Sequence, residues 1–589
     1  MSSVAAQSGS EEQIRPIVWS VAGTDSGGGA GLAADQRAAE AFGVHLCPVV
    51  AAITAQNSRA VTRVAPVAPE LLDAQLTALA DDMPPAAIKT GLLGSAENVA
   101  VLARWVDRLR ERAPVALVVD PVLGASSGAA FADAAVLRAY RELLLPRATL
   151  VTPNEGEARR LMGEGGIGDA PQPLTPTLSP EGRGSQQPNP LISAAAVLPP
   201  LPAGERVGVR GAAPPVSEVG ISSLAQSLHA LGAQAVAITG GDSAGDGKLA
   251  LDWIDTPHAQ GWLALPRIDT PHTHGTGCTF ASSAAAALAL GFVAADALVL
   301  AKMATAQALR HGYAAGQGAG PVAARAGFGT EPSLLPRLSW GEHLDFGGDG
   351  VSPRSDSDIG LYAIVDSAER VQQVLRAGVR LVQLRIKTPD APDAAWQVAL
   401  REAIAQSLVA CRAAGAVLVV NDHWRLAAEL AAGDVHGLAL HLGQEDLVAL
   451  GHAGRAELAR TGLPLGISSH SLWELCRARA LNPWYVACGP VWPTLTKAMP
   501  WRPQGLDNLA WWVHMAGAPV VAIGGILAPD QLELAARSGA HGVCVVRGLG
   551  DDLSRTLPAW QAALRAGRAA LRLAVPALPH SSLDMAQSA

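Results

Sequence analysis

A glycine-rich run near the middle of the chain, His274-Gly275-Thr276-Gly277-Cys278, has residue types suited to binding a phosphoryl group. It opens a long alanine-rich stretch that we expect to be helical, so the N–H groups of Gly275, Thr276 and Gly277 should point at one spot. The positive end of a helix binds anions and stabilises the charge that develops during phosphoryl transfer. An ordinary glycine-rich helix start is the alternative.

Cys278, in the same turn, is a candidate base. A free thiol has a pKa of about 8.5 and a helix N-terminus lowers it, so we expect a thiolate that accepts a proton from a substrate hydroxyl. A small buried cysteine is the alternative. Because phosphoryl transfer depends mainly on positioning and charge neutralisation, loss of Cys278 is expected to slow such a reaction rather than abolish it.

A second group of polar residues follows short apolar runs in the C-terminal part of the chain. The cations Arg385, Lys387 and Lys497 suit a polyanion, and the carboxylates Asp422 and Asp446 suit a shared Mg²⁺. Together they predict a diphosphate site, although each charge alone would be interpreted as a solvated loop residue. Amide and hydroxyl groups accompany them at Gln383, Asn421, Ser468, Thr494 and Thr496.

The elements that position this second group form a regular series. Eight short apolar runs lie between residues 361 and 546, separated by helical stretches, which predicts a (β/α)8 TIM barrel. Catalytic groups of such barrels lie at the carboxyl ends of the strands, where the polar residues occur. Gly524-Gly525 after the seventh run and Val546-Arg547 at the eighth predict a phosphate pocket, and therefore a second, phosphorylated substrate.

The N-terminal half alternates apolar runs with helical stretches, which is typical of a mostly parallel sheet covered on both faces. Ligand-binding groups in such sheets gather beyond the carboxyl ends of the strands. Gly23, Asn154 and Glu157 lie at or just after such ends. The run 23–31 is rich in glycine but lacks the Gly-Lys-Ser/Thr of a P-loop.

Changes in composition divide the chain. We predict a disordered tail at 1–13, an α/β domain at 14–326 with a disordered proline-rich insertion at about 165–218, a linker at 327–358, a barrel at 359–573 and a second tail at 574–589.

Composition excludes several classes of protein. Hydrophobic residues make up 49% of the chain and charged residues 16%, which excludes wholesale disorder. The net charge of −8, without a basic stripe, argues against nucleic-acid or membrane partners. The N-terminus resembles no signal peptide, and the six cysteines have no CxxC spacing, so we expect a cytoplasmic protein. The apolar stretch 281–301 contains Asp296 and is interpreted as a buried helix.

The N-terminal motifs together resemble those of the ribokinase superfamily, and within it the hydroxymethylpyrimidine/phosphomethylpyrimidine kinases. The motifs are Ala22-Gly23-Thr24-Asp25 through Ala34-Asp35, Thr54-Ala55-Gln56-Asn57, Lys89-Thr90-Gly91, Thr152-Pro153-Asn154 and 272–278. The resemblance implies a three-layer α/β/α fold. It also implies that Asp35 and Gln56, with Gly23, hold an aminopyrimidine, that Asn154 and Glu157 organise Mg²⁺ and ATP phosphates, and that Cys278 takes the position of the superfamily's base.

This half departs from the family pattern at two places. Thr239-Gly240-Gly241 stands where the family commonly has Lys-Gly-Gly, and 124–128 lacks a lysine that is often found there. Both changes bear on nucleotide contacts.

The C-terminal motifs resemble those of thiamine-phosphate synthase: Gln383-x-Arg385-x-Lys387, Asn421-Asp422, 441–446, Pro493-Thr494-x-Thr496-Lys497 and Gly524-Gly525-Ile526. The resemblance implies that Mg²⁺, Arg385, Lys387 and Lys497 stabilise departing pyrophosphate. Asn421 and Ser468 would hold the pyrimidine, while Thr494, Thr496, Gly525 and the loop after the last strand would hold thiazole phosphate. Arg547 stands where the family usually has serine, and we expect it to bind the phosphate.

The resulting hypothesis is a bifunctional enzyme of thiamine biosynthesis. It would use ATP and Mg²⁺ to convert hydroxymethylpyrimidine and its phosphate to the diphosphate, and then couple the diphosphate to thiazole phosphate, without channelling. One alternative is a functional barrel joined to a kinase half that has decayed to a pyrimidine-binding module. Another is a barrel of the regulatory or thiazole-isomerising type. The expected partners are small molecules, and the sequence leaves a homo-oligomer open.

Overall fold

The computed structural model describes residues 15–124, 131–163, 220–240, 248–344, 346, 358–494 and 500–583. The predicted N-terminal tail and proline-rich insertion lie outside these residues. Within the described residues, no helix is long and apolar enough to cross a membrane.

The N-terminal half is built on a sheet whose strands follow the order β10-β9-β8-β7-β6-β5-β4-β1-β2-β3 among the described residues. The central strands β2-β1-β4-β5-β6-β7 are parallel, and the strands at both edges are antiparallel. The strand bounds are β1 Ile17–Gly23, β2 His45–Gln56, β3 Val61–Pro66, β4 Ala87–Thr90, β5 Ala116–Val119, β6 Leu150–Val151, β7 Val236–Thr239, β8 Leu249–Asp255, β9 Gln260–Pro266 and β10 Arg337–Leu338.

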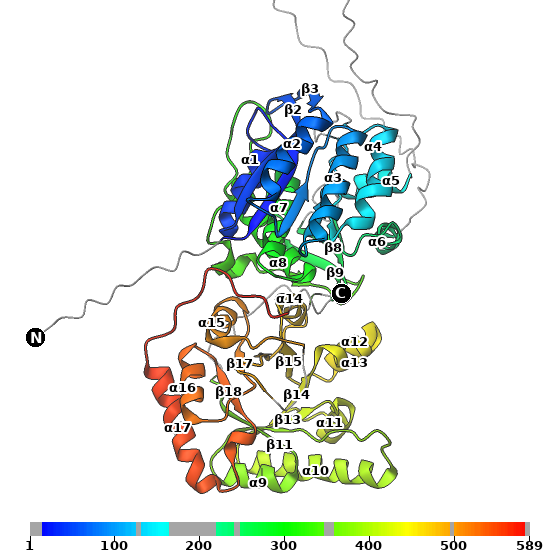
Figure 1. Cartoon of the computed structure of the whole chain (residues 1–589). Helices are drawn as coiled ribbons and strands as arrows, with labels where there is room; N and C mark the ends of the chain where they lie inside the picture. Colours follow the sequence, from blue (N-terminus) through cyan, green and yellow to red (C-terminus); the bar gives the residue numbers. More distant parts are fainter. Residues whose placement is uncertain are drawn as a thin grey trace, which may run out of the picture.

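Helices cover both faces of this sheet, which gives the expected three layers (Figure 1). Their bounds are α1 Gly31–Phe42, α2 Pro69–Ala80, α3 Ala96–Arg110, α4 Ala134–Ala139, α5 Glu155–Met162, α6 Ile221–Ala230, α7 Thr276–Ala289 and α8 Ala294–Arg310. Side chains alternate across a strand, so Val18 packs with α1, α7 and α8, whereas Trp19 packs with α2 to α6. The alanine-rich α7 is buried along most of its length, because small side chains let it lie close to the sheet and α8.

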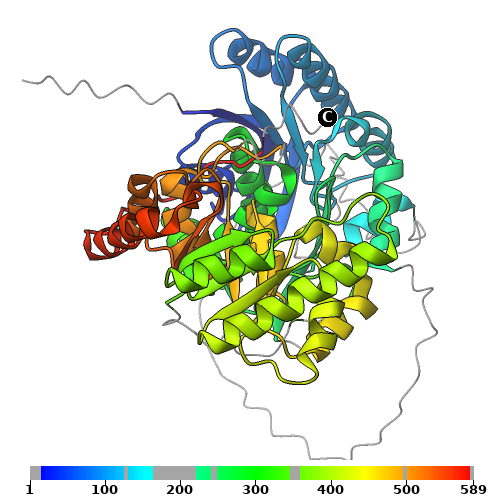
Figure 2. The ribbon, with the colours of Figure 1, turned by 90° about the horizontal axis from the view of Figure 1, so that it is seen from below.

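The C-terminal half is a closed barrel of parallel strands, as predicted. Its strands are β11 Gly360–Val365, β12 Leu381–Leu384, β13 Val417–Asn421, β14 Leu438–Leu442, β15 Leu465–Ser469, β16 Tyr485–Cys488, β17 Val520–Ala522 and β18 Gly542–Val545. Its helices are α9 Ala368–Arg376, α10 Ala394–Ala413, α11 Trp424–Ala431, α12 Gln444–Ala449, α13 Gly451–Arg460, α14 Leu472–Arg479, α15 Gly505–Met515, α16 Pro529–Arg537 and α17 Leu553–Ala569. Figure 2 shows these helices from below, in front of the sheet.

The two halves pack directly on each other, with α8 against α14 (Figure 1). Asp296, in the first turn of α8, accepts a hydrogen bond from the backbone N–H of Trp473 in α14 at 2.9 Å. The Trp340 indole N–H donates to the Arg477 carbonyl at 3.1 Å, and the Arg479 guanidinium donates to the Pro336 carbonyl at 3.1 Å. The contact is therefore made by polar and aromatic groups of both halves.

Two predicted boundaries need correction. The expected linker at 327–358 begins with ordered structure, namely the short helical turns η3 Phe328–Thr330 and η4 Pro332–Leu334 and the strand β10, which pairs with β9. The expected tail at 574–589 includes residues that pack between the halves, since Ser581, Ser582 and Leu583 are buried. Neither segment shows a helical or strand periodicity long enough to predict its order, which depends on contacts with distant parts of the chain.

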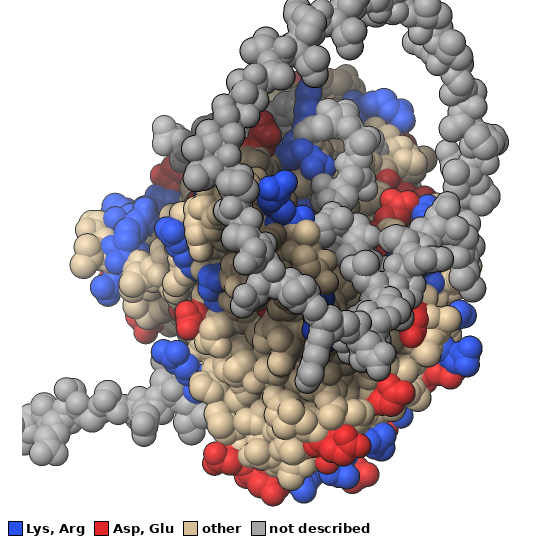
Figure 3. Space-filling view, turned by 90° about the horizontal axis from the view of Figure 1, so that it is seen from above, with Lys and Arg blue, Asp and Glu red and all other residues tan. Residues whose placement is uncertain are grey.

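On the part of the upper face that the described residues form, Lys and Arg lie among Asp and Glu (Figure 3).

Candidate functional site

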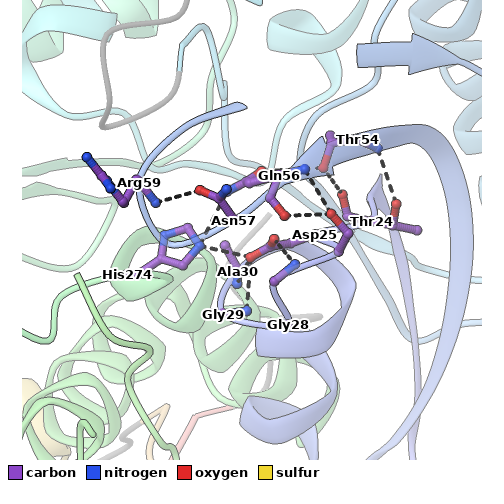
Figure 4. Close-up of polar contacts among 12 residues, drawn as sticks. Thr24, Asp25, Gly28, Gly29, Ala30, Thr54, Gln56, Asn57, Arg59 and His274 are labelled. Atoms are coloured by element: carbon purple, nitrogen blue, oxygen red, sulfur yellow. Dashed lines mark hydrogen bonds and ion pairs between the residues drawn. The ribbon is translucent and has the colours of Figure 1, made fainter. Parts of the chain in front are cut away.

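The loop between β1 and α1 is organised by one carboxylate, Asp25 (Figure 4). Its oxygens accept hydrogen bonds from the backbone N–H groups of Gly27, Gly29 and Ala30 at 2.8, 2.9 and 2.8 Å, and His274 Nε2 lies at 2.8 Å. Burial alone would raise the pKa of Asp25, but the bonds from His274 and these N–H groups lower it to about 2. Asp25 is thus an anion that joins the first loop to the glycine-rich turn before α7.

His274 also reaches the end of β2, where its Nε2 lies 3.3 Å from Gln56 Nε2 (Figure 4). Gln56 is fixed through its backbone, because the Ser26 hydroxyl donates to its carbonyl at 2.6 Å and its N–H donates back at 2.8 Å. A cleft lies beside these groups, lined by Gly27, Gly29, Asn57, Ser58, His274, Ala315, Gly316, Ala319 and Pro321. The structure therefore brings together Gln56 and the turn 274–278, which are far apart in the sequence.

Two glycines make this approach possible. A Cβ on Gly29 would lie 2.2 Å from His274 Cδ2. Gly275 has φ +88, and a Cβ there would lie 2.2 Å from the Gly29 carbonyl oxygen. The glycine-rich loops are thus required to let two backbone segments touch, in addition to any role in binding an anion.

A buried ionic cluster lies beneath this site. Lys89 Nζ is 3.0 Å from Asp35 Oδ1 and 3.6 Å from Asp120 Oδ2. The hydroxyls of Ser20 and Ser282 donate to Asp35 at 2.6 and 2.7 Å. Asp35 is 0% exposed and both its oxygens accept hydrogen bonds within the cluster, and its expected contact with a pyrimidine stays a prediction.

Cys278 lies at the start of α7, as predicted, but the expected direction of its pKa shift is wrong. Burial raises the pKa of the Cys278 thiol to about 12; Lys89 opposes this effect, while Asp35 and Asp120 add to it. The loss of hydration outweighs the helix dipole, so Cys278 is a protonated thiol at neutral pH.

Asn154 and Glu157 form a capping box at the start of α5. Glu157 N–H donates to Asn154 Oδ1 at 2.9 Å, and Asn154 N–H donates to Glu157 Oε2 at 3.0 Å. Burial and the neighbouring Asp120 raise the pKa of Glu157 to about 7, and burial raises that of Asp120 to about 6. Asp120 Oδ2 is buried and accepts no hydrogen bond. A bound cation would stabilise the ionised form of both carboxylates. Asp120 was not predicted as a site residue, although it follows directly after β5.

The two departures from the family pattern, at 239–241 and 124–128, fall only partly within the described residues. Gly240 N–H donates to Asp252 at 3.1 Å, and the Asp252 carboxylate is also bound by Lys302 at 2.6 Å. Gly241 and residues 125–130 lie outside the described residues.

Inside the barrel, a row of hydrogen bonds crosses from strand to strand. Gln383 Nε2 donates to the Tyr362 hydroxyl at 2.9 Å, and the hydroxyls of Tyr362 and Tyr485 are 2.8 Å apart. His441 then joins Tyr485 to the Ser468 hydroxyl, with both distances at 2.9 Å. Burial, assisted by Arg385 and His470, lowers the pKa of His441 to about 4, so the ring is neutral. Gln383 and Ser468 were predicted, whereas the two tyrosines between them gave no signal beyond apolar strand positions.

The predicted carboxylates gather at the catalytic end of the barrel. Asp422 has φ +64, a left-handed conformation that is costly for a residue with a side chain and occurs often at functional sites. Burial and Asp446 raise the pKa of Asp422, and Arg385 opposes them. Asp446 accepts the Gly443 N–H at 3.0 Å. Two interacting carboxylates beside an arginine fit the expected cation site, although no group of three or more His, Cys, Asp or Glu side chains suited to a metal occurs in the described residues.

The glycine pair after β17 lies against the loop that follows β16. Gly524 has φ +91, and a Cβ there would lie 2.7 Å from Pro490. Gly525 has φ +74, and a Cβ there would lie 2.6 Å from Trp492. Trp492 N–H donates to the Gly524 carbonyl at 3.1 Å. Val546 and Arg547 are exposed at the end of β18, and Lys387 is exposed after β12. Thr494 ends a described segment, while Thr496 and Lys497 lie outside the described residues.

Comparison with known families divides the chain where the fold does. The model of the phosphomethylpyrimidine kinase family matches residues 25–172 and 196–323, and that of thiamine monophosphate synthase matches residues 361–549. A probable thiamine biosynthetic bifunctional enzyme of Oryza sativa subsp. japonica, described as chloroplastic, is 32% identical over 570 residues, covering 93% of this chain and 88% of the relative.

Single-domain relatives match each half separately. A hydroxymethylpyrimidine/phosphomethylpyrimidine kinase of Synechococcus elongatus is 35% identical over 321 residues, covering 52% of this chain and 96% of the relative. A thiamine-phosphate synthase of Rhizobium etli is 46% identical over 187 residues, covering 32% of this chain and 84% of the relative.

Proposed function

Since this chain belongs to the family of bifunctional thiamine biosynthetic enzymes, with a kinase half and a thiamine-phosphate synthase half, we propose how each half uses the residues described above. The kinase half phosphorylates hydroxymethylpyrimidine and its phosphate to the diphosphate with ATP. The barrel then joins the diphosphate to thiazole phosphate, which yields thiamine phosphate and pyrophosphate.

In the kinase half, the pyrimidine binds beside Gln56, whose side-chain amide offers both a donor and an acceptor to the ring. Gly23, which ends β1, is the expected neighbour of the ring, and His274 lies against the Gln56 side chain. The transferred phosphoryl group binds at the N-terminus of α7, where the N–H groups of Gly275, Thr276 and Gly277 and the helix dipole stabilise its charge. Cys278 acts as a thiol within this turn.

The ATP phosphates and a cation belong near the start of α5. Asp120 and Glu157, together with Asn154, would hold Mg²⁺. Burial raises the pKa of both carboxyls, Asp120 raises that of Glu157 further, and Asp120 Oδ2 accepts no hydrogen bond, although Lys89 Nζ lies 3.6 Å away. When bound, Mg²⁺ would supply positive charge to the phosphate oxygens. Occupation of this position would keep both carboxylates ionised.

In the synthase half, Arg385, Lys387 and Lys497 bind the diphosphate, and Asp422 and Asp446 would hold Mg²⁺ against it. Departure of pyrophosphate places negative charge on the leaving group, so these cations stabilise the transition state more than the bound substrate. Asn421 and Ser468 hold the pyrimidine. The neutral His441 fixes the Ser468 hydroxyl, and through the two tyrosines it is linked to Gln383.

Thiazole phosphate binds on the opposite side of the barrel mouth. Gly524, Gly525, Thr494, Thr496 and the turn at Val546 and Arg547 surround its phosphate. The left-handed glycines after β17 would offer backbone N–H groups to this phosphate, and the Arg547 guanidinium would provide charge where the family usually has a serine.

The pair of carboxylates Asp422 and Asp446 beside Arg385 is the observation that most strongly supports the synthase assignment. The test uses the full chain with hydroxymethylpyrimidine, ATP, Mg²⁺ and thiazole phosphate, and measures ADP and thiamine phosphate in one reaction. We expect both products. Asp422→Asn should abolish thiamine phosphate while ADP release continues.

The same assay distinguishes the alternatives. Thiamine phosphate formed from supplied pyrimidine diphosphate, without any ADP release from ATP and hydroxymethylpyrimidine, would indicate a decayed kinase half. The synthase assignment would be contradicted if ADP were released but no thiamine phosphate formed, both in the reaction that starts from hydroxymethylpyrimidine and in the one supplied with pyrimidine diphosphate.

A further inference from the structure

The C-terminal segment 570–583, here called the strap, runs from the end of α17 to the catalytic end of the barrel. It begins against α16, where the Leu571 carbonyl accepts from Arg537 at 2.8 Å and Leu573 N–H donates to the Arg537 carbonyl at 3.3 Å. It ends with Ser581, Ser582 and Leu583 buried. A segment without a helix or strand is thus ordered by its contacts at both ends.

The strap passes between the halves at η3 of the kinase half. A Cβ on Gly329 would lie 2.3 Å from the Ala577 carbonyl oxygen and 2.6 Å from Leu578. The Gly329 carbonyl accepts from the Trp511 indole at 2.7 Å, and the Thr330 carbonyl lies 2.8 Å from His514 Nε2, both on α15. The turn η3 of the kinase half therefore contacts both the strap and helix α15 of the barrel.

At its end the strap binds the first turn of α15 through His580. The His580 N–H donates to Asn508 Oδ1 at 2.8 Å, and Asn508 Nδ2 donates to the His580 carbonyl at 3.0 Å. His580 Nε2 lies 2.9 Å from the Gln504 carbonyl, so this nitrogen is the donor. The Ser582 carbonyl accepts from Arg502 N–H at 2.9 Å.

Asn508 and Gln504 connect the strap, through hydrogen bonds and packing, to three loops at the catalytic end of the barrel. Asn508 Nδ2 donates to Gln504 Oε1 at 3.0 Å, and Gln504 Nε2 donates to the His470 carbonyl after β15 at 2.6 Å. Gln504 N–H donates to the Pro490 carbonyl after β16 at 2.7 Å. Trp501 stacks on His470 at 5.2 Å between ring centroids.

The third loop is the glycine pair after β17, which packs on residues 490–492. The chain of contacts therefore leads from the strap to the two sides of the synthase site: Ser468, next to His470, and Gly524-Gly525. With the strap in place Gln504 and Asn508 are 0% and 1% exposed, so the strap shields these two side chains from water.

We propose that the strap is a positioning element of the synthase site. His580 of the strap and Asn508 of α15 are the positioning residues, and the kinase half holds the strap in place through Gly329. The proposal rests on the synthase function proposed above. It means that synthase activity depends on a surface of the kinase half that is remote from the kinase site.

The test compares full chains that lack residues 575–589 with chains that lack only 584–589. Synthase activity is measured with supplied pyrimidine diphosphate and thiazole phosphate, and kinase activity by ADP release. We expect the longer deletion to lower synthase kcat/KM by about 10- to 100-fold, since loss of positioning is costly for bond-making steps. Kinase activity and the shorter deletion should match wild type.

Two point variants separate positioning from general destabilisation. His580→Gln keeps a side-chain donor and should stay within about threefold of wild type, whereas His580→Leu should lose synthase kcat with little change in thermal midpoint. Gly329→Val, in the kinase half, should lower synthase activity without lowering ADP release. Wild-type synthase rates in His580→Leu and the longer deletion would overturn the proposal. An inactive wild-type synthase would instead refute the proposed function.

Discussion

Asp35 and Cys278 show how a residue can occupy a recognised motif and still have surroundings that the motif does not predict. Lys89, from a third motif, binds Asp35 at 3.0 Å, and Asp35 and Lys89 both influence the pKa of Cys278. The burial of Asp35 and Lys89 could not be predicted from the motifs, since it depends on how closely α1, α7 and the sheet pack. The same packing removes water from the half-buried Cys278 and raises the pKa of its thiol.

Cys278→Ala should therefore reduce kinase kcat by less than about 100-fold, below or at the lower limit of what removal of a general base costs. The phosphoryl group is still bound by the N–H groups of the turn in this variant. The measurement is ADP release with saturating substrates. A fall of about 10,000-fold would show that the thiol is deprotonated in the complex and acts as the base.

Glu157 should make the kinase reaction sensitive to pH near neutrality. Its pKa is raised to about 7, mainly by burial and by Asp120, so it loses its charge as the pH falls through this value. The ionised fraction drops about tenfold between pH 8 and pH 6, and the apparent KM for Mg²⁺ should rise by a similar factor.

The matched control for this prediction is Glu157→Gln, which lacks the titrating group and preserves the amide geometry of the cap. Its KM for Mg²⁺ should be high and should change only about twofold between pH 8 and pH 6, the change that Asp120, with a pKa of about 6, would cause. An equal pH dependence in Glu157→Gln and wild type would assign the effect to another group.

At the scale of elements, the sequence was most informative where a helix or strand follows a regular pattern. The alternating runs of the N-terminal half and the even series of the C-terminal half predicted the three layers and the barrel. β10 and the strap were missed, because two residues of strand and a segment without periodicity depend entirely on long-range partners. The same reason explains why Tyr362 and Tyr485, ordinary strand residues in the sequence, were not predicted to join Gln383 to His441.

The turn before α7 offers a test of backbone geometry. Gly275→Ala should reduce kinase kcat/KM by at least about 100-fold, because a Cβ there would lie 2.2 Å from the Gly29 carbonyl oxygen. Gly291→Ala is the matched control, since Gly291 also has positive φ, +87, near the other end of α7, but has no atom within 4 Å of the added Cβ. Comparable losses in both variants would indicate helix destabilisation instead of a damaged site.

At the scale of the whole molecule, the halves form one packed body whose two sites are separated. The kinase site lies at the N-terminus of α7, and the helix of 14 residues spans about 20 Å before the chain turns into α8, whose first turn contacts the barrel. The turn before α7 thus lies at the end of α7 remote from the interface. This arrangement supports the prediction that the pyrimidine diphosphate is released into solution between the two reactions.

The buried Asp296 should make the stability of the interface depend on pH. Burial, together with Glu474, raises its pKa from 3.8 to about 7, although bonds from backbone N–H groups of α14 oppose the shift. A carboxyl whose pKa is higher in the folded state loses stabilisation as the pH rises from the unfolded to the folded pKa.

The thermal midpoint should therefore fall between about pH 5 and pH 8 in wild type, and fall less in Asp296→Asn, which keeps an acceptor for Trp473 without the charge. Asp296→Ala should lower the midpoint at both pH values, because the N–H groups of α14 lose their acceptor. An unchanged pH dependence in Asp296→Asn would show that Asp296 does not titrate at the interface.

The account's central claim is that one chain carries two complete sites, and that neither reaction needs the other site of the same chain to be active. Asp25→Ala should abolish ADP release, because three backbone N–H groups and His274 lose their acceptor, while thiamine phosphate still forms from supplied diphosphate. The most direct measurement mixes this variant with Asp422→Asn and supplies hydroxymethylpyrimidine, ATP, Mg²⁺ and thiazole phosphate. We predict that neither variant alone makes thiamine phosphate and that the mixture does; a mixture as inactive as its components would contradict the claim.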